Sequence, residues 1–168
     1  MITSQFVQTM SRYNAWQNQS LYGAAARLDD IERRKDRGAF FGSIHGTLAH
    51  LLWGDTIWMS RFDGWEKPDV GIPESPGWVD DWATLEARRI DADGRILDWA
   101  DRTTDAALEG KLSWYSGALK QDVTKPLALC VVHFFNHQTH HRGQVHALLT
   151  AAGARPEDTD LFIMPAEV

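Results

Sequence analysis

The amino-acid sequence predicts an all-α protein, a single four-helix bundle domain that takes in the whole chain, residues 1–168. The length is that of one domain, and no shift in composition marks a second one. Four long segments repeat apolar residues at helical spacing, whereas the alternation typical of strands is confined to one short segment. Because long amphipathic helices bury their apolar faces against one another, these observations favour a bundle.

The first two predicted helices cover about residues 3–28 and 39–62. No proline interrupts the first, and Asp63 and Gly64 end the second. The stretch 31–38 between them is charged and closes on a glycine, which is typical of a connection. Apolar residues recur at helical spacing in both segments, at Phe6, Met10, Tyr13, Leu21 and Ala25 in the first and at Phe40, Ile44, Leu48, Leu51, Leu52, Trp58 and Phe62 in the second.

A long loop follows the second helix. Residues 65–79 contain three prolines and two glycines, and the segment exceeds the ordinary length of a connection. We therefore expect this loop to have a function of its own. The third helix is predicted from Asp80 to about Leu108, because acidic residues favour a helix N-terminus and apolar residues, Ile90 among them, continue at helical spacing.

The last third of the chain is predicted to hold a small hairpin and the fourth helix. Residues 111–123 alternate roughly between polar and apolar around a glycine, which is the pattern of a hairpin. The fourth helix is predicted over residues 124–152, with Pro126 in its first turn and Gly153 just beyond its end. The tail from residue 155 onward is expected to lie along the bundle.

Charge and cysteine content restrict the class of protein. Twenty-three acidic against 17 basic residues give a net charge of −6, which argues against a nucleic-acid partner. The single cysteine, Cys130, allows no internal disulfide and indicates a reducing, cytoplasmic location. No apolar run approaches the ~20 residues that a membrane span needs, so we expect no membrane partner.

The fourth helix carries an unusual number of histidines. His133, His137 and His141 are spaced four residues apart, so neighbouring pairs lie one turn apart and could reach the same metal ion. His137 and His141 are the pair best aimed into a bundle interior. A stable site needs a third ligand, and the second helix offers His45 and His50, between which periodicity does not choose. Spacing alone also leaves open a plain structural bundle with coincidental histidines.

Three segments of the chain form recognisable motifs. Residues 137–144 read His-Gln-Thr-His-His-Arg-Gly-Gln and match an H-x-x-H-H-R-G-Q signature. Residues 42–55 contain His-Leu-Leu-Trp at 50–53, and residues 13–18 read Tyr-Asn-Ala-Trp-Gln-Asn. In this order the segments resemble the motifs of the fourth, second and first helices of the DinB/YfiT-like metalloenzyme family. The resemblance covers nearly the whole chain.

The resemblance implies a four-helix bundle with a divalent metal site. Carried over position by position, its ligands are His50 from the second helix and His137 and His141 from the fourth. Three imidazoles with water at the remaining position form a catalytic type of arrangement, and Ni²⁺ or Zn²⁺ is the metal expected from the ligand type.

The resemblance also implies a class of function. We expect a metal-dependent enzyme that acts on a small molecule, as a hydrolase or as a thiol-dependent transferase with a low-molecular-weight thiol as co-substrate. The alternative is a stress-associated protein that binds metal without catalysis. A homodimer is expected, because relatives commonly pair and because eight tryptophans would leave an apolar strip on the outside of one bundle.

Two further residues of the second helix have candidate roles near the site. Arg61 follows His50 by about three turns, so it could clamp an anionic substrate or form a salt bridge to another helix. Asp55 lies within the apolar stripe, where a carboxylate needs a partner, either a buried cation or a ligand histidine. On the fourth helix, Arg142 and Gln144 are expected to make packing contacts between helices, and the glycine between them is expected to allow close approach.

Overall fold

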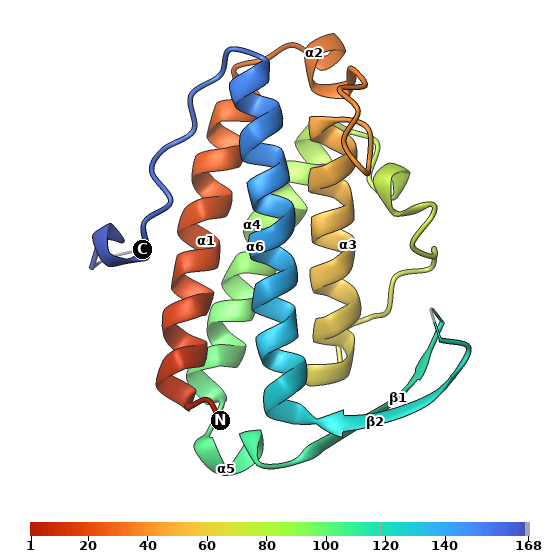
Figure 1. The fold of residues 1–168 in the computed structure, drawn as a ribbon, viewed down its shortest axis with the longest axis vertical. Helices are drawn as coiled ribbons and strands as arrows, with labels where there is room; N and C mark the ends of the chain where they lie inside the picture. Colours follow the sequence, from red (N-terminus) through yellow and green to blue (C-terminus); the bar gives the residue numbers. More distant parts are fainter. Residues whose placement is uncertain (118, 167–168) are drawn as a thin grey trace.

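The structure is a computed structural model that describes residues 1–117 and 119–166. Its described part contains six α-helices, two short 3₁₀ helices and one two-stranded sheet, so the predicted mostly helical class is confirmed (Figure 1). Ala118, within the predicted hairpin, and residues 167–168 of the tail lie outside the described residues. None of the described helices is both long enough and apolar enough to cross a membrane.

Four long helices run side by side and form the body of the molecule (Figure 1). Each packs against two others: α1 (Ser4–Ala26) and α3 (Ile44–Phe62) both contact α4 (Trp82–Arg102) and α6 (Leu127–Ala151). The apolar faces meet in one core. Its fully buried side chains include Val7, Leu21, Ile44, Leu48, Met59, Leu85, Ile96, Val131, Phe134, Val145 and Leu149.

The N-terminus of α3 corrects the predicted helix boundary at residue 39. The hydroxyl of Ser43 accepts a hydrogen bond from the Gly46 backbone N–H, which caps the helix at this point. Gly42 adopts a φ of +73°, which favours glycine and turns the chain before the cap. Phe40 therefore lies outside the helix and is 81% exposed, so its assignment to the apolar face was wrong.

Two other helix boundaries also differ from the prediction. The third predicted helix breaks into α4 and the short α5 (Asp105–Leu108), because the Thr104 hydroxyl caps a new helix. Ile90 is 69% exposed rather than buried. The predicted connection 31–38 contains the short helix α2 (Asp30–Arg34), which the Asp29 carboxylate caps.

The predicted hairpin is confirmed and is longer than expected. Strand β1 (Lys111–Ser116) pairs antiparallel with β2 (Gln121–Pro126), with Trp114 opposite Val123. Because the second strand continues through Pro126, helix α6 begins at residue 127 rather than 124. At its other end α6 is followed by Gly153 with a φ of +80°, as predicted for a glycine that ends a helix.

The long loop and the C-terminal tail both lie against helices. The loop after α3 contains η1 (Ser75–Gly77), which packs against α3, and the hairpin lies on the same side of that helix (Figure 1). The tail, which includes η2 (Leu161–Ile163), lies along α1. There the Tyr13 hydroxyl donates to the Thr159 carbonyl at 2.6 Å, which agrees with the predicted position of the tail.

Candidate metal centre

Three imidazoles from two helices converge beside the core. His50 comes from α3, and His137 and His141 come from successive turns of α6; one ring nitrogen of each lies within 4.8 Å of the other two. In the part of the chain that the structure describes, this is the one group of three histidine, cysteine or acidic side chains close enough to share a metal ion. His50 and His141 are buried and His137 is half-buried, so the protein presents a buried three-histidine group that could bind a metal.

The long loop fixes the orientation of the His50 ring. Nδ1 of His50 lies 2.7 Å from Oγ of Ser75, and that hydroxyl donates its own proton to the Ile72 carbonyl at 2.7 Å. The Ser75 oxygen must therefore accept from the Nδ1–H of His50, which leaves a lone pair on Nε2. On one face the ring also stacks against Phe41, with centroids 3.7 Å apart. Orienting His50 is thus a function of the long loop, for which its unusual length had predicted a role.

His141 and His137 are held by different means. Nδ1 of His141 lies 2.8 Å from Oε1 of Gln144, an acceptor one turn further along α6, so its Nε2 is the nitrogen left for a metal. His137 instead lies against Gly54 of α3, where a Cβ atom would come within 2.7 Å of the ring. These two contacts bring the imidazoles of α6 up to His50.

The site keeps its histidines neutral. Burial, together with the neighbouring His141, lowers the pKa of His50 to about 3. Burial also lowers the pKa of His137 to about 3, with smaller contributions from His141 and His50. The pKa of His141 is lowered by burial as well, against the opposing hydrogen bond to Gln144. Neutral imidazole is the form that binds a metal ion.

The donor set fits a divalent metal ion. Imidazole nitrogens suit Zn²⁺ and Ni²⁺, and the second nitrogens of His50 and His141 are hydrogen-bonded, as is usual for metal-binding histidines. Three protein ligands leave a further coordination position for water or a substrate. His50 and His137 also line a cavity of about 580 Å³ that extends along α3 between the long loop, the hairpin and α6. A small molecule in this cavity would lie beside the imidazoles.

Three other histidines, His45, His133 and His146, lie outside this group. The Nε2 atom of His45 is 2.9 Å from the carbonyl oxygen of Val79, so this buried side chain holds the end of the long loop and does not face the site. His133 lines the cavity, with its ring centroid 6.0 Å from that of His137. His146 lies between α1 and α6, next to the C-terminal tail.

Asp55 has a buried cation as its partner, which was one of the two predicted alternatives. Its carboxylate is fully buried and accepts hydrogen bonds from Arg89 at 2.6 Å and from Gln138 at 2.9 Å. Arg89 also pairs with Asp93 at 2.9 Å. This network joins α3, α4 and α6 and does not touch a ligand histidine. Arg89 was not among the candidate residues, because nothing in the sequence distinguishes it from the many other charged residues of its helix.

The residues after His141 have divided roles. Arg142 is buried and donates to the side chain of Asn14 on α1, an interhelical contact as predicted. Gln144 instead bonds to His141 on its own helix and orients that ring, a role that only its spacing of three residues could have indicated. A Cβ atom at Gly143 would meet nothing within 4 Å, so the prediction of close helix approach at that position was wrong.

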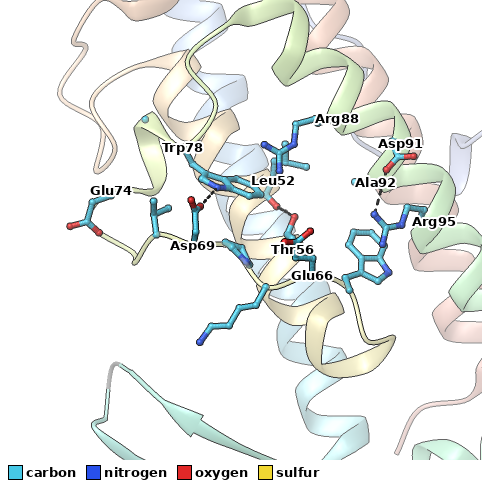
Figure 2. Close-up of a pocket in the computed structure, with 15 residues that line it drawn as sticks. Leu52, Thr56, Glu66, Asp69, Glu74, Trp78, Arg88, Asp91, Ala92 and Arg95 are labelled. Atoms are coloured by element: carbon cyan, nitrogen blue, oxygen red, sulfur yellow. Dashed lines mark hydrogen bonds and ion pairs between the residues drawn. The ribbon is translucent and has the colours of Figure 1, made fainter.

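A larger cavity, of about 810 Å³, lies on the other side of the long loop, between α3 and α4 (Figure 2). Four of its polar side chains engage one another: the Trp78 indole donates to Asp69 at 3.0 Å, and Arg95 pairs with Asp91 at 3.5 Å. Within the described residues, no three acidic or histidine side chains of this cavity lie close enough together to share a metal ion. The larger volume would favour this cavity as the functional site, whereas the three histidines favour the smaller cavity beside His50.

Fold and site define a mostly helical protein with a buried three-histidine group. Within that class the chain belongs to the DinB family, whose family model matches residues 1–167. Over 169 residues it is 25% identical to the protein named Protein DinB of Bacillus subtilis (strain 168), with 95% of each chain covered. The family resemblance of the sequence motifs is thereby confirmed.

Proposed function

We propose that this chain is a divalent-metal-dependent enzyme that acts on a small molecule. His50, His137 and His141 would hold Ni²⁺ or Zn²⁺, and the four long helices would be the four-helix bundle that supports the site. One observation carries the proposal: two of three convergent, neutral histidines form part of the wall of a cavity of about 580 Å³, a volume typical of small-molecule sites. A purely structural metal site would be closed by a fourth protein ligand.

The residues around the site have distinct tasks in this proposal. A bound metal would supply Lewis-acid chemistry and lower the pKa of a water or thiol at its open position. Ser75 and Gln144 hold His50 and His141 in one tautomer, so their Nε2 atoms need no rearrangement before use. Phe41 and Trp53 both stack with the buried ring of His50 and help to keep water from it.

The proposed reaction class follows from the coordination position that three protein ligands leave open on the metal. We assign the chain to hydrolases or to thiol-dependent transferases with a low-molecular-weight thiol as co-substrate, because a coordinated water or a coordinated thiol is the nucleophile that a three-histidine site can generate. Among the described residues, Cys130 is buried, and burial raises the pKa of its thiol, so the protein's own thiol is a poor nucleophile.

The proposal is tested by turnover with a defined metal. Protein loaded with Ni²⁺ or Zn²⁺ is screened against esters and amides, and against pairs of small thiols and electrophiles. We expect turnover that requires the metal and is lost in His137→Ala but kept in His146→Ala, a matched control on the same helix. Stoichiometric metal without turnover in either screen would instead favour a non-catalytic metal-binding protein.

A homodimer remains part of the proposal, although for a different reason than the sequence offered. None of the tryptophans is exposed, so an outer strip of tryptophan does not exist. The exposed apolar side chains are others, with Phe40 at 81% and Phe162 at 87%. Light scattering of the purified protein should give about twice the chain mass of 19.0 kDa. A mass equal to one chain at micromolar concentration would contradict the dimer.

A further inference from the structure

The cavity beside the histidines has a second, cationic end. His50, Gly54, Trp58 and Arg61 follow one another at spacings of three and four residues, so they share one face of α3, and all four line the cavity. The imidazoles stand at one end of this row and the guanidinium of Arg61 at the other. The cavity therefore connects a candidate metal centre with a positively charged group.

Aromatic side chains hold the Arg61 guanidinium in place. Its central carbon lies 4.5 Å from the centroid of Trp58 and 5.2 Å from that of Trp114 on strand β1. The two indoles themselves meet edge to face at 5.6 Å. Stacking engages the flat face of a guanidinium and leaves its N–H donors, which lie in the plane, free for a ligand. The hairpin thus contributes to the position of the charge.

Arg61 has no counter-ion in the part of the chain that the structure describes. It is half-buried, burial lowers its pKa, and the opposing influence comes from Cys130, a thiol rather than a carboxylate. By contrast the buried Arg89 of α4 has two carboxylate partners. A partly desolvated cation without an anion is costly to maintain, which the binding of an anion would offset.

The other charged groups of the cavity agree with an anionic ligand. Lys67 adds a second cation to its wall. The acidic lining residue is Asp69, whose carboxylate is engaged by the Trp78 indole of the neighbouring cavity, a contact visible in Figure 2. The two cations, Arg61 and Lys67, outnumber the one carboxylate in the lining, and the neutral imidazoles add no negative charge at its other end.

We propose that Arg61 binds an anionic group of the substrate, a carboxylate or a phosphate-like group, and that the substrate is an elongated molecule whose reacting end reaches the three histidines. The proposal rests on the proposed function. Eleven residues of helix separate His50 from Arg61, a rise of about 16 Å between their Cα atoms. Because long helical side chains lean toward the N-terminus, the ligand-binding atoms lie closer, on the order of 10 Å apart. Trp53, Trp58 and Trp114 between them fit an apolar middle section.

The anion site can be tested on the metal-free protein by calorimetry. The probes are hexanoate, hexylphosphonate and the neutral control hexanol. We expect both anions to bind at least about tenfold more tightly than the alcohol, and Arg61→Gln to abolish that difference, because a hydrogen-bonded charge pair is lost. Arg61→Lys should retain part of it and shows that a substituted protein still folds. A preference for one anion identifies the head group.

Arg88→Gln is the matched control. Arg88 stacks on Trp78 at 4.0 Å but belongs to the neighbouring cavity, so its replacement should leave the preference for anions unchanged. Equal affinity for the anions and hexanol, or an unchanged preference in Arg61→Gln, would overturn the proposal. The calorimetry uses metal-free protein and so does not depend on the metal site. If the protein binds the anions but no metal, the proposed function is contradicted and the anion site is not.

The proposed distance between the three histidines and Arg61 is tested with Co²⁺-loaded protein. The ligands are mercaptocarboxylates of increasing chain length, each paired with the mercapto-alcohol of the same length. Binding of the thiol is followed by the Co²⁺ absorption spectrum. We expect the carboxylate to improve affinity about tenfold or more only above a threshold length, and only while Arg61 is present. An improvement that is the same at every length would contradict an anion site at the far end of the cavity.

Discussion

Gly54 of α3 faces the imidazole of His137 on α6 so closely that a Cβ atom would lie 2.7 Å from Cε1 and 3.3 Å from Nδ1 of the ring. Carbon atoms in contact are normally about 3.5–4.0 Å apart, so no other residue fits at position 54 without displacing the histidine. The glycine is therefore a part of the site, although it offers no ligand atom.

Gly54→Ala should weaken metal binding without unfolding the helix, because alanine is the better helix former but pushes the His137 ring away from its two partners. We expect at least about a tenfold loss of Zn²⁺ affinity, measured by competition with a chromogenic chelator. Gly143→Ala, whose Cβ would meet nothing within 4 Å, is the control and should bind the metal normally. Equal affinities of the two variants would show that the contact at Gly54 does not matter.

Ser75→Ala removes the acceptor that fixes the tautomer of His50. The ring would then be free to place its proton on either nitrogen, and the affinity for metal should fall about tenfold to a hundredfold. Isothermal titration with Zn²⁺ measures the change. Ser60→Ala, which removes a hydroxyl bonded to the Ile57 carbonyl on the same helix as His50, should leave the affinity unchanged. A Ser75→Ala protein with normal affinity would contradict the assigned role of the loop.

The sequence was most informative where residues carry a local pattern. The pattern of apolar residues predicted the long helices, and the spacing of His137 and His141 predicted two of the three histidines of the group, because a helix fixes the relation between residues four apart. The choice of His50 over His45 came from the family motif alone. Both histidines proved to be buried, and what separates them is their contacts: Ser75 for His50 and the Val79 carbonyl for His45.

The sequence could not predict contacts between segments that are far apart along the chain. Ser75 lies in a loop, and nothing in its neighbourhood shows that this loop turns back onto α3. Arg89 lies on a helix rich in charges, and only the tertiary arrangement shows that it is 2% exposed and paired with Asp55. Gly54 rather than Gly143 proved to be the point of close approach for a similar reason, since spacing does not reveal which side of a helix meets its neighbour.

The buried network around Arg89 gives the stability of the protein a pH dependence. Burial raises the pKa of Asp93 from 3.8 to about 6, against the opposing effect of Arg89. Between these two values the folded protein binds a proton that the unfolded chain does not. The stability contributed by the protonated Asp93 is therefore fully present below the unfolded pKa of 3.8 and is lost as the pH rises through about 6.

Asp93→Asn, which imitates the protonated carboxyl, should remove this dependence. Between about pH 4 and pH 7 the free energy of unfolding of the wild-type protein should fall relative to that of the variant by up to about 3 kcal/mol, as measured by urea unfolding. Parallel pH profiles for the two proteins would contradict a raised pKa at Asp93.

Elemental analysis of tag-free protein decides whether His50, His137 and His141 together hold one divalent metal ion. We expect about one metal ion per chain in the wild type and in His45→Gln, which keeps a donor for the Val79 carbonyl, and less than about a tenth of an ion in His50→Ala. Metal retained at full stoichiometry in His50→Ala or in a His137/His141 double variant, or its loss in His45→Gln with retention in His50→Ala, would show that these three histidines are not the ligands.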